Sequence, residues 1–372
     1  MLDKIKSIYQ EHEFVILILL AIGLAKLDPN IGVRYGYPEI TATWIAVIFI
    51  FLLSGLSLQT SELHIAAFHN VPFNIYIQCF NFFFVSAFVY GVCNYILYPY
   101  HIIQNIHLLH GMIVCSCLPM AINTVIVITK SSHGDDAAAI FNCAFANLIG
   151  VVISPFLILV FIGMSSKMNP VDVFFKLALR VLLPVFVGQL LQRLAFVQVH
   201  IISKYKHIFK NLQQYCLVYI VYTVFCSTFI TSSTASSSSS NTALSTRDVL
   251  MVFICQIALL LLVMIIAWTM LRYLFPNQPK LQAMGFVGCT FKTVAVGVPL
   301  VNAMYAATAP ELVALYTLPL LIWHPMQLII GSLLAPYLAR YVDSELQRLQ
   351  QSTTEDGISP TETTSLLASQ KA

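Results

Sequence analysis

The sequence predicts an all-α polytopic membrane protein with ten transmembrane helices. Hydrophobic residues make up 58% of the 372 positions and charged residues only 9%, whereas an ordinary soluble domain carries about 25% charged residues. The apolar residues form runs of the length that a helix needs to cross a bilayer, about 20 residues. The runs are apolar on every face, unlike the alternating strands of a β-barrel. The expected spans are approximately 14–30, 40–58, 72–97, 107–129, 137–163, 171–192, 214–231, 249–274, 281–306 and 312–338.

The polar ends of the chain bound the expected membrane domain at 14–340. The first span follows a polar segment, 1–13. It is too long for the core of a signal peptide and no small-residue cleavage site follows it, so we expect it to be retained. The tail, 341–372, is polar, and we expect it to be disordered and cytosolic.

Lysine and arginine residues indicate the orientation, because cytosolic loops are enriched in them. With both termini in the cytosol, the outer loops hold four of these residues: Lys26, Arg34, Lys167 and Arg247. The cytosolic side holds twelve: Lys4, Lys6, Lys130, Arg193, Lys204, Lys206, Lys210, Arg272, Lys280, Arg340, Arg348 and Lys371. The imbalance favours cytosolic termini. Because the basic residues are spread around helix ends, the net charge of +3 does not indicate a nucleic-acid partner.

Ten spans divide into two halves of five, about 14–163 and 171–338. Because each half has an odd number of spans, the second half is expected to lie inverted in the membrane. Inverted repeats that bind a substrate at the midplane are a common plan of secondary transporters. Direct similarity between the halves is weak, and the pairs that we match are Gln78 with Gln256 and Asn123–Thr124 with Lys292–Thr293.

Lys292 is the most informative residue of the chain. It lies in the apolar stretch C-T-F-K-T-V-A-V-G-V-P, 289–299, and no comparable stretch offers a carboxylate to neutralise it. A charge at the middle of a bilayer costs roughly 2.5–3.5 kcal/mol on insertion scales. Such a residue faces a polar cavity, so Lys292 marks a candidate functional site.

Helix-breaking residues accompany polar residues in the fourth and ninth spans. The residues are Pro119, Asn123 and Thr124 in the fourth span, and Lys292, Thr293, Gly297 and Pro299 in the ninth. We interpret both spans as helices broken at mid-depth, whose free N–H and C=O groups bind anions and cations. Ordinary helix packing is the alternative, because Gly and Pro are frequent in membrane helices.

Other polar side chains extend the candidate lining into the third, fifth and tenth spans. They are Gln78, Asn142, Cys143, Asn147, His324 and Gln327. An amide oxygen is a suitable ligand for Na⁺ and a thiol is a poor one. Hydrogen bonding between helices explains buried asparagines equally well, and a lone histidine in an apolar helix is more often a packing residue than a ligand.

Several other patterns point away from enzymes and channels. No nucleophile–base–acid set lies at a plausible depth for hydrolysis, no metal site is indicated, and nothing resembles a filter loop. We interpret Asp172, Lys176 and Arg180 as an interfacial face whose side chains snorkel. The serine-rich stretch 232–246 is expected to be a flexible linker on the outer or lumenal side.

The tail contains E-T-T-S-L-L, 362–367. Sorting adaptors bind an acidic residue followed at this spacing by two leucines, because an extended peptide can place its acid on a basic patch and the leucines in an apolar pocket. Glu362, Leu366 and Leu367 are therefore a candidate sorting signal. A chance match is the equally good alternative.

Five long motifs, in order, resemble the bile acid:sodium symporter family, in its cotransporter-seven-type subgroup. They are L-S-G-L-S-L-Q-T-S-E-L (53–63), A-A-A-I-F-N-C-A-F (137–145), Y-T-V-F-C-S-T-F (222–229), C-T-F-K-T-V-A-V-G-V-P (289–299) and L-P-L-L-I-W-H-P-M-Q-L-I-I-G-S (318–332). The resemblance implies a panel bundle of spans 1, 2, 6 and 7, and a core bundle of spans 3–5 and 8–10 in which spans four and nine cross.

The resemblance also implies a site and a function. Sodium ligands of the family match Gln78, Asn123, Thr124, Cys143, Asn147, Lys292 and Thr293 here. Transporting members have a carboxylate and a glutamine in the ninth span, where this chain has Lys292, so we expect a carrier of a small anionic solute with weak or absent sodium dependence. The subgroup is linked with restraint of calcium entry and with the Golgi and secretory pathway, beside the plasma membrane. A non-transporting regulator that binds a calcium-entry component is the alternative.

Overall fold

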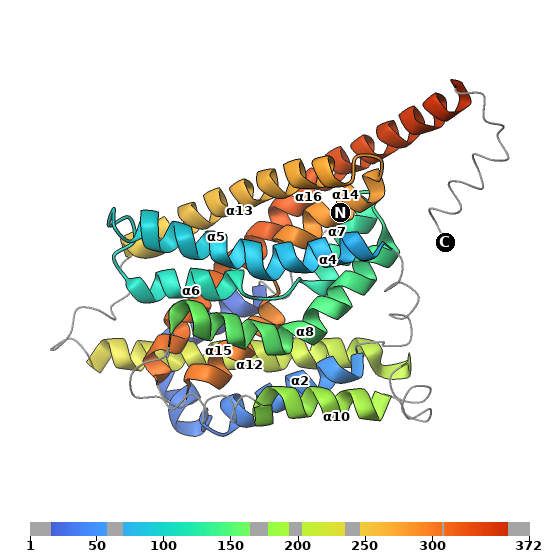
Figure 1. Cartoon of the computed structure of the whole chain (residues 1–372). Helices are drawn as coiled ribbons and strands as arrows, with labels where there is room; N and C mark the ends of the chain where they lie inside the picture. The colour runs from blue at the N-terminus through green and yellow to red at the C-terminus, as the bar shows by residue number, and fades with distance from the viewer. Residues whose placement is uncertain are drawn as a thin grey trace, which may run out of the picture.

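The computed structural model describes residues 16–57, 70–163, 178–192, 203–234, 246–306 and 309–355. The regular structure of these residues is helical, apart from one isolated β-bridge (Figure 1). After a first helix, Ile16–Leu27, the α-helices are α2 (Val47–Ser57), α4 (Val71–Cys79), α5 (Val85–Val92), α6 (Ile106–Ser116), α7 (Ile122–Ser131), α8 (Asp136–Ile162), α10 (Leu183–Gln192), α12 (Ser203–Thr234), α13 (Thr246–Leu274), α14 (Pro279–Thr290), α15 (Val294–Tyr305) and α16 (Pro310–Glu355). Five π-helical stretches adjoin them: η1 (Ile31–Tyr35), η2 (Thr41–Ala46), η3 (Phe80–Phe84), η4 (Cys93–Leu97) and η5 (Ala178–Leu182).

Several of these helices can cross a membrane. The four that are long and apolar enough by themselves are Val71–Leu97, Asp136–Ile162, Arg247–Leu274 and Leu312–Gln351. The spans expected at 107–129 and 281–306 are each interrupted, so they consist of two shorter helices, α6 with α7 and α14 with α15. The expectation of an all-α protein with apolar spans is therefore confirmed for the described residues.

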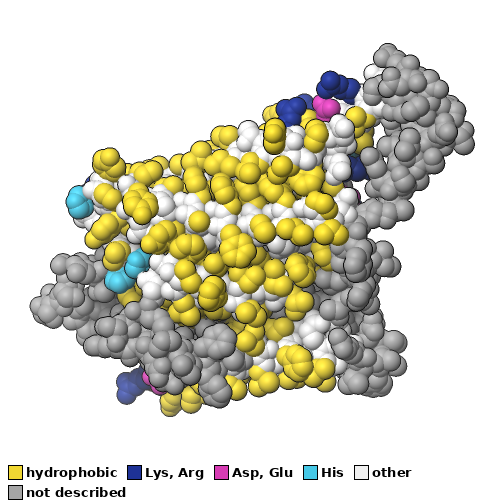
Figure 2. Space-filling model, viewed as in Figure 1, with side chains coloured by type: hydrophobic (Ala, Val, Ile, Leu, Met, Phe, Trp, Pro, Cys, Tyr) yellow, Lys and Arg dark blue, Asp and Glu magenta, His cyan; other side chains and the backbone are white. Residues whose placement is uncertain are grey.

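The surface in Figure 2 is a broad apolar band whose charged side chains lie toward the ends. Large apolar side chains such as Phe186, Ile265 and Leu333 are more than half exposed. Contiguous apolar surface of this extent is rare on soluble monomers and indicates contact with another apolar phase. Lipid is the phase that such a band fits.

Two sets of helices can be distinguished by their contacts. The first set contains α2, α10 and α12, which lie together at the lower edge of Figure 1, with η1, η2 and η5 packed on them. Helices α2 and α10 approach closely because Gly55 and Gly188 face backbone atoms of the opposite helix. The Gln189 side chain donates a hydrogen bond of 2.8 Å to the Gly55 carbonyl.

The second set contains α4 to α8, α13, α14 and α16. Helix α16 packs along α6 and also contacts α13 and α14, while α8 packs on α7. The sets meet through α15, which contacts α16 of the second set and α12, α2, η2 and η5 around the first, and through α16, which also contacts α12.

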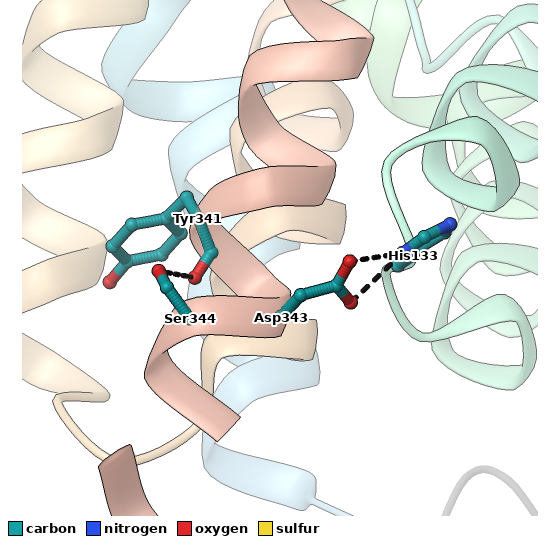
Figure 3. Close-up of polar contacts among 4 residues, drawn as sticks. All are labelled: His133, Tyr341, Asp343 and Ser344. Carbon is teal, nitrogen blue, oxygen red and sulfur yellow. Dashed lines mark hydrogen bonds and ion pairs between the residues drawn. The ribbon is translucent and has the colours of Figure 1, made fainter. Parts of the chain in front are cut away.

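Helix α16 continues to Glu355, well past 338, where the tenth span was expected to end. The segment 341–355, expected as part of a disordered tail, is therefore helical. Figure 3 shows a contact between this segment and the α7–α8 loop. The two carboxylate oxygens of Asp343 lie 3.0 and 3.1 Å from Nδ1 of His133. The Tyr341 hydroxyl donates to Gln282 of α14 at 2.6 Å. The candidate sorting residues Glu362, Leu366 and Leu367 lie outside the described residues.

Candidate functional site

The site lies where two interrupted helices cross. Helix α6 ends at Ser116 and α7 begins at Ile122, while α14 ends at Thr290 and α15 begins at Val294. The segments between them, 117–121 and 291–293, are called the crossing below. A helix interruption inside a membrane leaves backbone groups without partners, and those groups must be satisfied by other parts of the protein.

The two interruptions satisfy one another. Met120 and Lys292 form an antiparallel β-bridge. The Thr293 N–H donates to the Pro119 carbonyl at 2.9 Å, and the Ala121 N–H donates to the Phe291 carbonyl at 3.3 Å. Proline has no N–H and disfavours a helical conformation of the residue before it, so Pro119 explains why the first helix stops here.

Side-chain amides complete the hydrogen bonding of the crossing. Gln327 of α16 accepts from the Lys292 N–H at 2.8 Å and donates to the Lys292 carbonyl at 2.9 Å. Asn147 of α8 donates to the Met120 carbonyl at 2.8 Å. The Nδ1 atom of His324 lies 3.2 Å from the Gln327 amide nitrogen, so His324 positions Gln327. Both amides thus replace the partners that a continuous helix would have supplied.

The Lys292 ammonium is enclosed by oxygen atoms. The residue is 1% exposed, and its Nζ donates to the Asn81 carbonyl at 2.6 Å, to Asn81 Oδ1 at 2.9 Å and to the Leu118 carbonyl at 3.1 Å. These three oxygens are called the oxygen cage below. They use all three donors of the ammonium group. None of them belongs to a carboxylate, so the charge is solvated by dipoles, as a bound hard cation would be.

Asn81 was not among the residues that the sequence singled out. It lies in the stretch F-N-F-F-F of η3, where the helix through α4 and α5 takes a π-helical turn. π-Helical turns are rare in proteins as a whole, but many of those that occur lie at functional sites. The available signal was a single amide among four phenylalanines, in a span that also contains Asn74, Gln78 and Asn94. The Asn81 side-chain nitrogen is buried and has no partner among the described residues.

A second polar cluster joins α4 to α8. Gln78 donates to the backbone and side-chain oxygens of Asn142, at 3.1 and 3.2 Å. Asn142 in turn donates to Asn74 at 2.8 Å. Gln78 and Asn81 lie one helical turn apart on the same helix, so this cluster supports the face that carries the oxygen cage. Hydrogen bonding between helices, one of the two explanations considered for the asparagines, describes Asn142 in this structure.

The remaining candidates fall into different environments. Thr124, Cys143 and Thr293 are buried near the crossing, and Asn147 donates a further hydrogen bond to the Cys143 carbonyl. Asn123 is exposed, on a face of α7 that also carries Val127 and Lys130. The structure thus gathers Lys292, Gln327, His324 and Asn147 around the crossing, and leaves Asn123 at its edge.

Two expectations from the sequence are wrong. Gly297 and Pro299 do not break the ninth span; both lie inside α15, and the interruption at 291–293 contains neither glycine nor proline. Arg180 does not snorkel, because it is 3% exposed. Asp172 and Lys176 lie outside the described residues.

Gly297 permits the close approach at the crossing, and Gly297→Leu is expected to disrupt it. A Cβ atom at this position would collide with Leu118 and Leu320. Overpacking of this kind costs about 1–3 kcal/mol, so the variant should unfold at a lower temperature than the parent. Gly91→Leu is the matched control, because a Cβ at Gly91 would meet nothing within 4 Å. Equal melting temperatures for the two variants in detergent would contradict this account.

This chain is similar in sequence to known membrane transporters. A model of the SBF-like CPA transporter family matches residues 12–340. Sodium/bile acid cotransporter 7-A of Xenopus laevis is 33% identical over 341 residues, 91% of this chain and 94% of that protein. Sodium/bile acid cotransporter 7 of Rattus norvegicus is 32% identical over 334 residues, 89% and 93% of the two chains. Solute carrier RCH1 of Candida albicans is 23% identical over 388 residues, 92% of each chain.

These matches confirm the resemblance that the five motifs carry, over the whole expected membrane domain. They also place the chain among membrane transporters and not among enzymes. The chain belongs to the SBF-like CPA transporter family.

Proposed function

We propose that this protein is an alternating-access carrier that moves a small anionic solute with weak or absent dependence on sodium. The Lys292 ammonium in its oxygen cage is the observation that carries this proposal. A fixed ammonium does at this position part of what a bound cation does: it occupies the oxygens, and its field attracts an anion. No carboxylate is among its hydrogen-bond partners to cancel that field.

The proposed architecture is ten spans in two inverted halves of five. An interrupted helix in each half, α6–α7 and α14–α15, supports it. We infer that the set of α2, α10 and α12, with the first helix, is the panel bundle of the family. The set of α4 to α8, α13, α14 and α16, joined by α15, is the core bundle.

The unequal burial of α7 and α15 supports alternating access. These two helices follow the two interruptions, so they are equivalent in an inverted repeat. Apart from Ala295, all residues of α15 are buried, and the helix packs against α12, α2, η2 and η5. In contrast, α7 exposes Asn123, Val127 and Lys130 on one face. From this difference we infer a state that is closed where α15 ends and more open where α7 ends.

Both termini are proposed to lie in the cytosol, with the protein in the plasma membrane and in Golgi and endosomal membranes. On this topology α7 ends at the cytosolic face and α15 at the outer face. Any restraint of calcium entry is proposed to follow indirectly from transport. The alternative is a regulator that binds a calcium-entry component and moves no solute.

Transport by the purified protein in liposomes tests the proposal and the alternative together. Uptake of radiolabelled taurocholate, sulfate, phosphate and citrate is measured in sodium buffer and again with choline in place of sodium. We expect saturable uptake of at least one of these anions, changed less than about twofold by the replacement, because the ammonium already occupies the cation position. Empty liposomes provide the background.

Two outcomes would overturn the proposal. Uptake that stops without sodium would show that Lys292 does not stand in for a cation. No uptake of any of the four anions, by protein that is monodisperse and correctly folded, would favour the regulator.

The tail carries a separate prediction about location. If Glu362, Leu366 and Leu367 form a sorting signal, Leu366→Ala combined with Leu367→Ala should increase the surface fraction about twofold or more, because adaptor binding needs both leucines in an apolar pocket. Surface biotinylation against total protein measures this fraction. Thr363→Ala combined with Thr364→Ala is the control in the same segment, and a surface fraction equal to that of the control would exclude the signal.

A further inference from the structure

Arg180 is a second buried cation, distant from the crossing. It lies in η5 and is 3% exposed. Its Nη1 donates to the Ala303 carbonyl at 3.2 Å, and its guanidinium carbon lies 4.0 Å from the ring centroid of Trp44 in η2. Its Nε is buried and has no hydrogen-bond partner among the described residues. The described residues also contain no salt bridge to Arg180.

The contacts of Arg180 join the two sides of a closed interface. Arg180 and Trp44 belong to the stretches η5 and η2, which pack around α2. Ala303 belongs to the last turn of α15, where helix carbonyls lack intrahelical partners and the helix dipole is negative. A guanidinium there is favourable while α15 stays in place. Movement of α15 away from η2 and η5 would remove the hydrogen bond and uncover the charge.

The position of Arg180 relates it to the first cation. Ala303 lies ten residues along α15 from Thr293, which corresponds to roughly 15 Å at the rise of an α-helix. Lys292 at one end of α15 and Arg180 at the other are both buried and both solvated without a carboxylate. An anion that reached the crossing along α15 would therefore pass from one cation to the other.

We propose that Arg180 is an anion-binding gate residue at the end of the protein where α15 terminates. In the closed state the guanidinium holds the Ala303 carbonyl; in the open state it binds the oxyanion group of the incoming solute. Arginine suits this role because it is always protonated and its planar fork matches carboxylate, sulfate and phosphate groups. This inference rests on the proposed function. It adds a site at which the anion enters and the side of the membrane on which that site lies.

The test uses the charge of a thiol reagent as the probe. Ala303→Cys, in an otherwise intact chain in nanodiscs, is treated with the anionic sulfonatoethyl or the cationic trimethylammonioethyl methanethiosulfonate. Mass spectrometry of the peptide that contains residue 303 gives each rate, normalised to the same reagent with a free thiol. Ala303 is 4% exposed, so reaction requires opening. We expect the anionic reagent to be favoured roughly five- to tenfold.

The variants separate the charge from the hydrogen bond. Arg180→Met should reduce the preference to about one and raise both rates, because the closing contact is lost. Arg180→Lys should keep the preference and raise both rates. If Arg180→Met does not fold, loss of the preference in folded Arg180→Lys would contradict the role of the charge. Arg247→Met, an exposed arginine at the start of α13, is the control and should change nothing.

An anionic preference that persists in Arg180→Met, or that is absent from the parent, would overturn the inference. Either result would show that the guanidinium does not attract an anion when this end of the protein opens. The readout needs no transport, so it is independent of the liposome experiment. Failure of uptake in liposomes would remove the carrier, and failure of the reagent test would remove only the gate.

Discussion

Lys292→Ala should abolish transport, with a loss of at least a hundredfold, while the protein still folds and reaches its membrane. The substitution removes the charge that attracts the anion and leaves the three oxygens of the cage without a donor. Folding survives because these oxygens can be hydrated. A cavity of about 10 Å³ adjoins Lys292 and is lined mainly by apolar side chains such as Val85 and Leu259, so the cage oxygens are the polar partners that a water would find there. It is near the size that one water needs, and truncation of the lysine enlarges it.

Uptake per correctly inserted molecule is the measurement. Lys292→Met keeps the length of the side chain without its charge and should be as inactive as Lys292→Ala, which separates charge from volume. Lys280→Ala is the control, because Lys280 is exposed at the start of α14. Lys292→Glu should introduce sodium dependence by restoring a carboxylate to this position. Normal uptake by well-expressed Lys292→Ala would show that transport does not need the Lys292 ammonium in place of a bound cation.

Gln327→Leu should lower stability far more than the same substitution at an exposed position of α16. Leucine has a similar volume but leaves the N–H and the carbonyl of Lys292 without partners. Each buried unsatisfied group costs about 1–3 kcal/mol, so the total is about 2–6 kcal/mol. Such a loss is a large part of the stability of a typical protein, and the crossing should separate on mild heating.

The melting temperature in detergent measures this loss of stability. Two further variants show whether it comes from the lost hydrogen bonds. Gln327→Glu keeps an acceptor for the Lys292 N–H but cannot donate to its carbonyl, so its stability should lie between those of the parent and Gln327→Leu. Gln347→Leu makes the same substitution at an exposed position of the same helix and should be neutral. If Gln327→Leu and Gln347→Leu melt alike, Gln327 does not hold the crossing.

Much of the helical framework could be predicted from hydropathy. The helices Val71–Leu97 and Asp136–Ile162 begin and end within a residue of the expected spans 72–97 and 137–163. Length and apolarity determine such helices, because a backbone in lipid must satisfy its own hydrogen bonds. The end of α16 could not be predicted in this way, because the helix continues beyond its apolar part. Beyond residue 338 the helix makes tertiary contacts such as Tyr341 with Gln282, which leave no trace in hydropathy.

The candidate site could be located from Lys292, and Gln327 and Asn147 were among its expected lining, but the oxygens that hold the ammonium could not be predicted. The interruption at 291–293 lacks glycine and proline, and exists because Gln327 and the segment 117–121 supply hydrogen bonds from elsewhere in the chain. Asn81 and Arg180 were missed or misread for the same reason. Whether an amide faces a neighbouring helix, or an arginine faces a carbonyl, depends on rotations that one helix does not determine.

The mutual satisfaction of the two interruptions has a consequence for biogenesis. Leu118 and Lys292 are 174 residues apart in the chain, so the first interrupted helix is synthesised long before its partner. Until residue 293 has left the ribosome, the backbone groups of 117–121 lack the segment 291–293 that pairs with them, and the Asn81 carbonyl lacks the Lys292 ammonium. Contacts of such separation form late in folding. The N-terminal half is therefore inserted in the membrane with these hydrogen bonds unmade. Insertion of the ninth span supplies the missing partners and completes the packing of both halves.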